Sequence, residues 1–399
     1  MDNKVILSAG LVGLAGYLPA KKIPNSEEFS KFLEEETTLH PDYIASIKES
    51  GCLPGTIETN YDGWESQPWF DSWLKSLPSK KQSDAFQGTK ERRRVPLDPC
   101  SVKNSLYPHP MLSSDAETLA GALAIFNSNI NKSEIDLVLV SSLVPDRHVP
   151  LNASLVQHKL GLNAGAYNVD TCCSSFVTMM EVASTYVRCG LKKKVLIIAS
   201  SLDSIVNDKS TYYSVDTGDA AVAGIVAEEQ EGYGYLSSCS TSHGSRHSAI
   251  IFQKRKPNLL VTTTQCQSYD HDYVTFHDME MCREIACNAQ QDMKEVVEKA
   301  LTKAGFTIKD IDFLVTHQPV SWAANAWREA LGVPKEKTYE SFEKYANIAC
   351  CSTATNLLEA IEKNLIKKDD KVMVASSGAG ENHIALLHKI SPSFVENVR

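Results

Sequence analysis

Short apolar runs along the chain predict β-strands that are buried on both faces. They are rich in Val, Ile and Leu and do not alternate with polar residues: LVLVSS (137–142), VLIIASS (195–201), FLVT (313–316) and VMVASS (372–377). Strands between two helical layers have this pattern, whereas a strand with one solvent-facing side alternates. Apolar residues at spacings of three and four, as from Phe176 to Val187, predict helices between the strands. The pattern therefore predicts an α/β fold.

The N-terminal apolar stretch from Val5 to Leu18 could be confused with a secretory signal. Asp2 removes the positive start that such a signal needs, Pro19 follows the stretch, and Lys21 and Lys22 lie at the wrong end. We therefore predict a buried first strand that ends in a turn.

Three blocks of sequence recur in the same order and at nearly the same separation, which indicates an internal duplication. When the blocks are aligned by their similar residues, Asp136 corresponds to Asp312, Glu181 to Glu359, and Ala199 to Ala375. We predict two similar halves, residues 1–230 and 231–399, whose sheets pack about an internal pseudo-twofold axis.

Residues 26–85 do not fit the repeat and form a predicted insertion. The segment has 12 acidic and 5 basic residues, three tryptophans, and only short helical patterns at Glu27 to Glu36 and Asp42 to Glu49. Two interpretations remain open: a folded excursion on the surface, or a lid that caps a substrate entrance.

Composition narrows the class of protein. The 399 residues are 43 % hydrophobic and 22 % charged, as in globular proteins that fold in water. No apolar run reaches the roughly 18 residues that a transmembrane helix needs, so we expect no membrane span. The net charge of −9 argues against nucleic-acid binding by bulk electrostatics. The 11 cysteines include two adjacent pairs but no CxxC, so we expect reduced thiols in the cytoplasm, without a disulfide framework or metal site.

Cys173 is the first candidate for chemistry. It lies in DTCCSSF (170–176), between a predicted strand and a predicted helix. A cysteine at a helix N-terminus gains a stabilised thiolate from the unpaired N–H groups and the helix dipole. A buried structural cysteine is the alternative that this motif alone leaves open.

Three further motifs could converge on the same site. His317 ends a buried strand, and the carboxyl ends of strands are where open α/β sheets place chemistry. Asn347 precedes the helix of the second half, in the loop equivalent to that of Cys173. The turn SSGAG (376–380) lets backbone N–H groups approach a ligand. Taken singly, these could be a structural histidine, a helix-capping asparagine and a simple turn. Taken together, Cys173, His317 and Asn347 supply a nucleophile, a base and a polar donor.

With these motifs in place, the chain resembles the thiolase superfamily and, within it, the β-ketoacyl-ACP synthase III (KAS III) branch. Cys172-Cys173-Ser174-Ser175-Phe176 is similar to the family's Ala-Cys-Ser-Gly-Phe, which makes Cys173 the nucleophile. His317-Gln318 and Tyr345-Ala346-Asn347 are similar to the family's His-Gln and Tyr-Gly-Asn. Ser175 and Ala346 stand where the family has glycine. The resemblance implies a duplicated thiolase-like fold of five layers, αβαβα, with the insertion as a cap.

The resemblance also implies a mechanism. Cys173 would take an acyl group from a thioester of CoA or of the phosphopantetheine of acyl carrier protein, without a bound cofactor. Backbone N–H groups of Cys173, Gly378 and Gly380 would form the oxyanion hole. His317 and Asn347 would then support decarboxylative condensation with a malonyl-type thioester. A role in specialised metabolism is weakly indicated by the insertion.

Other residue roles follow only from the resemblance. Val149 takes the position where a relative that condenses without decarboxylation has a glutamate, which argues against that reaction; in KAS III the same position lines the substrate tunnel at a homodimer interface. Phe176 is the second residue implied for the tunnel. Arg92 and Arg93, with Lys90 and Arg94, could attract a phosphate or an acidic carrier protein, or could form a solvated basic turn. Asp219 is interpreted as structural.

Two other functions remain open. The first is an acyltransferase that passes the acyl group to an alcohol or an amine. The second, from another class, is a non-catalytic partner subunit of a ketosynthase heterodimer, although such partners usually lose the cysteine or the histidine.

Overall fold

The N-terminal half forms a mixed sheet. The computed structural model describes residues 6–59, 71, 91–96, 111–206, 216–254 and 272–398. In this part of the chain the first sheet has five strands, in the spatial order β1 (Ser8–Tyr17), β7 (Asp219–Glu229), β6 (Lys194–Leu202), β4 (Leu137–Ser142) and β5 (Gly165–Asn168). Strand β4 is parallel to β5 and β6, whereas β7 is antiparallel to β6 and β1. The predicted first strand is confirmed as β1.

The C-terminal half repeats this order. Its sheet contains β11 (Phe313–Thr316), β12 (Lys371–Gly378), β13 (Asn382–Lys389) and β8 (Gly234–Ser242). Strand β11 is parallel to β12, and the next two pairs are antiparallel, as in β4–β6–β7–β1. The predicted boundary at 230/231 falls between β7 and β8. Two small antiparallel sheets of two strands pair β2 (Thr56–Thr59) with β3 (Glu91–Arg94), and β9 (Ile250–Lys254) with β10 (Asp272–Phe276).

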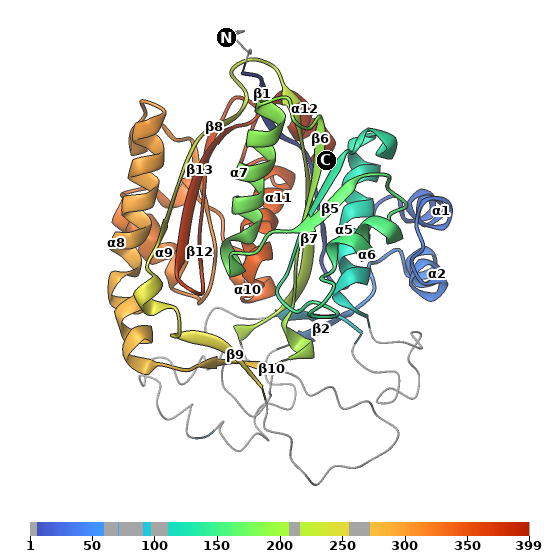
Figure 1. Cartoon of the computed structure of the whole chain (residues 1–399), viewed down its shortest axis with the longest axis horizontal. Helices are drawn as coiled ribbons and strands as arrows, with labels where there is room; N and C mark the ends of the chain where they lie inside the picture. Colours follow the sequence, from blue (N-terminus) through green and yellow to red (C-terminus); the bar gives the residue numbers. More distant parts are fainter. Residues whose placement is uncertain are drawn as a thin grey trace.

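Helices and sheets alternate in five layers (Figure 1). Within the described residues the α-helices are α1 (Ser26–Glu36), α2 (Pro41–Ser50), α5 (Ser113–Ser128), α6 (Ala153–Lys159), α7 (Ser175–Arg188), α8 (Met279–Lys303), α9 (Ala323–Leu331), α10 (Phe342–Tyr345), α11 (Ser352–Glu362) and α12 (Pro392–Val398). Helices α7 and α11 lie between the sheets, α5 and α6 cover the first sheet, and α8 and α9 cover the second. The predicted five-layer thiolase-like architecture is confirmed. Among the described helices, none has the length and apolar character needed to span a bilayer.

Strand β6 shows why the apolar runs do not alternate. Val195 and Ile197 face the central core with α7 and α11, whereas Leu196 and Ile198 face the core under α5. All four side chains are fully buried. Since both sheet faces are covered by helices, each strand position must be apolar to avoid burying an unpaired polar group.

The structure corrects the register of the duplication. Helices α7 and α11 begin at Ser175 and Ser352, which makes Glu181 equivalent to Leu358 and not to Glu359. Strands β6 and β12 begin at Lys194 and Lys371, which makes Ala199 equivalent to Ser376 and not to Ala375. Both matches taken from sequence similarity were therefore wrong by one residue, in opposite directions. A shift of one position is hard to see in short apolar blocks, where several registers match about equally well.

The described part of the insertion packs on the outside of the first half. Phe29 and Phe32 of α1 contact Phe126 of α5, with ring centroids 5.4 and 5.6 Å from it. Helices α1 and α2 match the two helical patterns predicted in this segment. Residues 60–70 and 72–85, on which the lid hypothesis depends, lie outside the described residues.

We expect Phe29→Ala to detach α1 and α2 from α5. The ring is fully buried, and a large-to-small change at such a position typically costs about 3–5 kcal/mol of the free energy of unfolding. The midpoint of chemical denaturation should fall accordingly. Leu191→Ala, at a side chain that is 66 % exposed, serves as the control and should change the midpoint little. A midpoint in Phe29→Ala equal to that of the control would contradict the packing described.

Candidate active site

Cys173 lies in a tight turn at the start of α7. The 3₁₀ turn Cys172–Ser174 leads directly into the helix. Cys172 has a left-handed backbone, with φ 55°, and its N–H donates to Asp170 Oδ1 at 2.8 Å. Cys173 therefore occupies the helix N-terminus that the sequence predicted, where unpaired N–H groups favour negative charge.

The sulfurs of the two adjacent cysteines interact. Cys172 Sγ and Cys173 Sγ are 3.8 Å apart. This contact, together with burial and the charge of Asp203, raises the pKa of Cys173. The same contact lowers the pKa of Cys172. Since ionisation of one sulfur disfavours ionisation of the other, the two thiols compete for the thiolate form.

The Gly-rich turn after β12 lies against the turn of Cys173. A Cβ on Gly378 would approach the Thr171 carbonyl oxygen to 2.3 Å, so only glycine permits this contact. Ser376 Oγ donates to the Cys173 carbonyl oxygen at 3.0 Å. The backbone N–H of Ala379 reaches both sulfurs and opposes the rise in the pKa of Cys173. The turn therefore supplies an N–H donor beside the sulfur of Cys173.

His317 directly follows β11, as predicted. Its N–H donates to the Ala375 carbonyl oxygen at 3.0 Å, so the residue lies beside the end of β12. The side chain is buried, and Nδ1 has no hydrogen-bond partner among the described residues. Burial lowers the pKa of His317 to about 3. The ring is therefore neutral near pH 7, with one N–H to donate.

Asn347 lies in a short bridge to the segment before β7. Its N–H donates to the Asp216 carbonyl oxygen at 2.8 Å, and its own carbonyl accepts from the Gly218 N–H at 3.0 Å. A Cβ on Gly218 would approach the Tyr345 carbonyl oxygen to 2.1 Å, so this contact also needs glycine. Asn347 Oδ1 accepts from the Ala349 N–H at 2.8 Å. Its Nδ2 remains as a donor with no hydrogen bond to the described part of the chain.

These segments meet in the central layer, between the two sheets. The turn Ala349–Cys351 starts two residues after Asn347 and packs against the turn Cys172–Ser174. The neighbouring thiol of Cys351, burial and then the thiol of Cys173 raise the pKa of Cys350. His317 reaches the same region through β12, because its strand pairs with the strand whose Ser376 binds Cys173. The pseudo-twofold thus brings the two equivalent turns together.

Comparisons with known proteins agree with this arrangement. Residues 167–244 match the family model for 3-oxoacyl-[acyl-carrier-protein (ACP)] synthase III, and residues 301–390 match the model for its C-terminal part. The chain is 30 % identical over 330 residues to a β-ketoacyl-[acyl-carrier-protein] synthase III of Caldanaerobacter subterraneus subsp. tengcongensis, covering 82 % of this chain and 92 % of that protein. The protein of the same name from Natranaerobius thermophilus is 30 % identical over 342 residues, covering 84 % and 96 %.

The chain belongs to the KAS III family. Solved structures share its fold: KAS III from Thermus thermophilus has a TM-score of 0.70 at 24 % identity, covering 95 % of this chain and 98 % of that one. OleA from Xanthomonas campestris, with bound lauric acid and lauroyl-CoA, has a TM-score of 0.67 at 18 % identity, covering 96 % and 99 %. The protein is therefore a KAS III-like ketosynthase, in the class of acyl-transferring enzymes.

The basic cluster of this KAS III-like chain does not face solvent as a whole. Arg92 is fully buried and lies 3.9 Å from Glu58 Oε2, so the suggestion that it contacts a carrier protein is wrong. Arg93 is also buried: its guanidinium donates to the Pro19 carbonyl oxygen at 2.9 Å and lies over the ring of Tyr345. Successive residues of β3 point to opposite faces of the strand, so both faces are covered at these two arginines, which the charge pattern alone could not reveal.

The two residues implied for the tunnel occupy different environments. Val149 is 87 % exposed, on the loop between β4 and α6. Phe176 belongs to the central core, with its ring tip 3.3 Å from the position of a Cβ on Gly224. Their roles as tunnel residues stay predictions. Asp219, interpreted as structural, accepts from the N–H groups of Val95 and Ser204 at 2.9 Å, and thereby links β3 to the turn after β6.

Two residues near Cys173 escaped the sequence analysis. Ala379 stands between the two glycines that were chosen, and its N–H is the donor that reaches the sulfurs. Asp203 is buried, and its pKa is raised to about 7 by burial and by the charge of Asp219. The spacing Gly-x-Gly could have suggested the middle residue, but nothing in LDS (202–204) signals a carboxyl group near the nucleophile.

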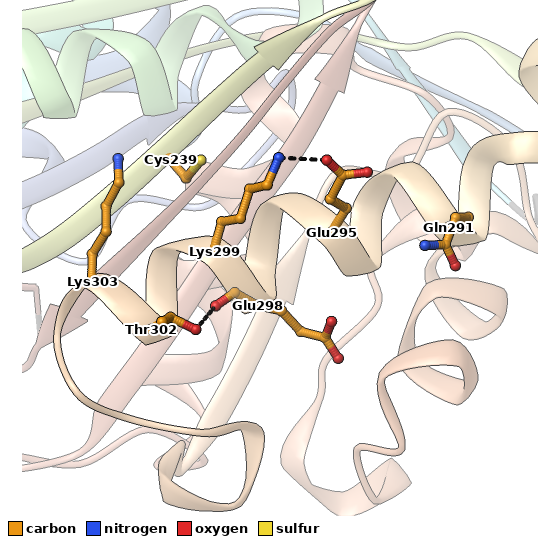
Figure 2. A pocket seen from close by; sticks show the side chains of 7 residues that line it. All are labelled: Cys239, Gln291, Glu295, Glu298, Lys299, Thr302 and Lys303. Carbon is orange, nitrogen blue, oxygen red and sulfur yellow. Dashed lines mark hydrogen bonds and ion pairs between the residues drawn. The ribbon is translucent and has the colours of Figure 1, made fainter.

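Two surface cavities lie outside this site. One, of about 480 Å³, runs along α8 (Figure 2) and is lined by Cys239, Gln291, Glu295, Glu298, Lys299, Thr302 and Lys303. The other, of about 350 Å³, is lined by Ala20, Lys21, Lys22, Arg93, Lys344, Tyr345, Glu359, Glu362 and Lys363. Neither is lined by Cys173, His317 or Asn347.

Gly378→Ala is expected to separate the two turns, because the new Cβ would overlap the Thr171 carbonyl. Overpacking of this kind costs about 1–3 kcal/mol of stability. Thioester turnover should fall as well, since the Ala379 N–H moves with the turn. Gly244→Ala is the matched control, because a Cβ there meets open space. Turnover and thermal midpoint measured for both variants test this; a normal Gly378→Ala enzyme would refute the close contact.

Proposed function

We propose that this KAS III-like ketosynthase loads an acyl group on Cys173 and condenses it with a malonyl-type thioester. The supporting observation is the grouping of the Cys173 turn, the Ala379 N–H and the segments that carry His317 and Asn347. We include no resident cofactor in the proposal, because a thiolate and hydrogen-bond donors suffice for this chemistry.

In the loading step, the Cys173 thiolate attacks the thioester carbonyl of acyl-CoA or acyl carrier protein. A carbon–sulfur bond to Cys173 forms and the bond to the carrier sulfur breaks; the carrier thiolate then takes a proton. The backbone N–H groups of Cys173 and of the Gly378–Gly380 turn, with Ala379 foremost, stabilise the oxyanion. Since the free carrier leaves before the second substrate reacts, the kinetics are ping-pong.

In the condensation step, His317 and Asn347 donate hydrogen bonds to the thioester oxygen of the extender. The carbon–carbon bond between the α-carbon and the carboxylate breaks, and CO₂ leaves. The electron pair of that bond stays on the extender and forms an enolate, which the two donors stabilise. The enolate carbon attacks the acyl-Cys173 carbonyl, and the carbon–sulfur bond to Cys173 breaks to give a β-ketoacyl thioester. A neutral imidazole suits this role, because a pKa of about 3 keeps the ring uncharged across the physiological range while one ring N–H is available to donate.

We also propose that the enzyme is a homodimer joined along β5. This strand is an edge of its sheet in the described chain, and edges with exposed apolar residues favour pairing. Exposed large apolar residues gather next to it: Val149, Leu151, Leu155 and Tyr167. A second copy would cover them and bring Val149 toward the partner's substrate tunnel.

The compartment we propose is the cytoplasm. All nine cysteines of the described residues are free, and several of them are exposed or only partly buried. Thiols of this kind persist in a reducing compartment. Acyl-CoA and acyl carrier protein, the proposed substrates, would be met there.

Cys173→Ala should abolish the covalent acyl adduct when the enzyme is incubated with a panel of acyl thioesters. Intact-mass spectrometry measures the adduct, and its mass identifies the preferred chain. Cys172→Ala is the matched control, and it should keep the adduct because the neighbouring sulfur is unchanged. An adduct that persists in Cys173→Ala and disappears in Cys172→Ala would assign the nucleophile to Cys172. Absence of any adduct or of iodoacetamide labelling at Cys173 in the wild type would favour a non-catalytic partner subunit.

Asn347→Ala should separate the two half-reactions. Acyl loading should be nearly unchanged, whereas CO₂ release from a malonyl thioester should fall about 10²–10³-fold, as is typical when one oxyanion donor is lost. Asn325→Ala, on the exposed surface of α9, is the control. Equal losses of loading and CO₂ release would contradict the role given to Asn347. Acyl transfer to an alcohol or an amine without CO₂ release would favour the acyltransferase instead.

A further inference from the structure

A cluster of metal-ligating side chains lies on the C-terminal half, outside the candidate active site. It contains His243 just after β8, Asp292 on α8 and His383 on β13. One ligand atom from each residue lies within 4.8 Å of the others. Three secondary-structure elements therefore deliver two imidazoles and a carboxylate to one point.

The distances suit a shared ion. His243 Nε2 lies 3.5 Å from Asp292 Oδ1, and His383 Nε2 lies 4.0 Å from Asp292 Oδ2. Two ligands that each lie about 2.1 Å from a tetrahedral zinc ion are roughly 3.4 Å apart. The two imidazole rings meet at 72° with centroids 5.7 Å apart, so they do not stack on each other. Small side-chain adjustments would bring all three groups to one ion.

His383 is a buried imidazole without a hydrogen bond. It is 2 % exposed, and neither Nδ1 nor Nε2 has a hydrogen-bond partner within the described ranges. Glu381 Oε1 approaches Nε2 to 3.3 Å as an ion pair, but that oxygen also lacks a hydrogen bond. Buried polar atoms left in this state cost free energy, which indicates a missing partner in the cluster.

Arg246 orients the carboxylates of the cluster. Its Nη1 binds Asp292 Oδ2 at 2.7 Å and Glu381 Oε2 at 3.0 Å. Asp292 Oδ1 then faces His243 and Glu381 Oε1 faces His383, while Asp292 Oδ2, which Arg246 binds, lies 4.0 Å from His383. Donors that hold the outer oxygen of a ligating carboxylate are a regular feature of metal sites. Arg246 also pairs with Glu284 at 2.9 Å.

The formal charge of the cluster also favours a bound cation. One guanidinium faces three carboxylates, those of Asp292, Glu381 and Glu284, so the cluster has a formal charge of −2 when both imidazoles are neutral. A divalent cation would neutralise it. Protonation of both imidazoles would do so as well, and the experiment below separates these two outcomes.

We propose that His243, Asp292 and His383 bind a divalent transition-metal ion of the zinc type. Imidazole nitrogen with one carboxylate oxygen suits Zn²⁺, whereas Ca²⁺ and Mg²⁺ prefer oxygen ligands alone. The His243 side chain is 35 % exposed, so the ion enters from that side, and water completes the coordination. Glu381 and His383 are both buried, and they close the side of the site opposite His243.

The site would stabilise the turn after β12. Glu381 follows Gly380 directly, and its carbonyl accepts from the His243 N–H at 2.9 Å. An ion held between β8, α8 and β13 would thus fix the far end of the turn that carries Ala379. The inference itself does not depend on the proposed condensation reaction, because its test measures metal binding.

The test uses the full chain, stripped with EDTA and titrated with Co²⁺ and then Zn²⁺. We expect about one bound ion per chain by elemental analysis after gel filtration, a raised thermal midpoint, and Co²⁺ visible bands without a thiolate charge-transfer band. The last point excludes binding by the cysteines. Elemental analysis at several pH values also separates the two ways of balancing the charge. A bound cation would be found with the protein, whereas protonation of His243 and His383 would leave the protein metal-free.

Single variants assign the ligands. His243→Ala and His383→Ala should each lose the Co²⁺ bands and the rise in thermal midpoint. His247→Ala, an exposed histidine four residues from His243, should keep both. His243 is partly exposed, so its variant remains folded enough to test even if His383→Ala is unstable. A wild type without bound ion, or full binding in His243→Ala, would overturn the proposal.

Discussion

The close approach of two backbone turns in the central layer is the contact on which the site depends. The turns before α7 and α11 are related by the internal duplication, and each contains a non-glycine residue with positive φ at the equivalent position, Cys172 and Ala349. Gly378 and Gly218 let neighbouring backbones approach where a Cβ would meet a carbonyl oxygen. Because protein interiors are close-packed, one added methyl group at either glycine would displace a whole turn.

Two carboxyl groups near this contact, those of Asp203 and Asp219, are buried. Burial and the charge of Asp219 raise the pKa of Asp203 to about 7. Burial and the charge of Asp203 oppose a thiolate at Cys173, so the backbone N–H groups at the start of α7 and in the Ala379 turn have to favour it. The active site thus combines a low dielectric with fixed dipoles, which strengthens each hydrogen bond formed there.

The sequence analysis was most reliable for features that follow from burial along a strand. It was least reliable for features that depend on contacts between segments far apart in the sequence. Unbroken apolar runs identified the strands because every position in them is covered. The same runs could not set the register of the repeat, which was wrong by one residue. Arg92 was placed on the surface because charge usually lies there, yet its side chain is fully buried. His243, Asp292 and His383 have no recognisable spacing, since three elements distant in the sequence bring them together.

By itself, the sequence determined the layered α/β fold, its duplication, and the types of side chain available for chemistry, because these follow from local periodicity and from motifs of adjacent residues. Tertiary structure alone decided which backbone N–H reaches the sulfurs, which imidazole is held neutral, and which oxygens Arg246 occupies. The physical reason is that donor direction, desolvation and pairing depend on neighbours that are far away along the chain. A residue's identity states what it can donate or accept, and only packing selects its partner.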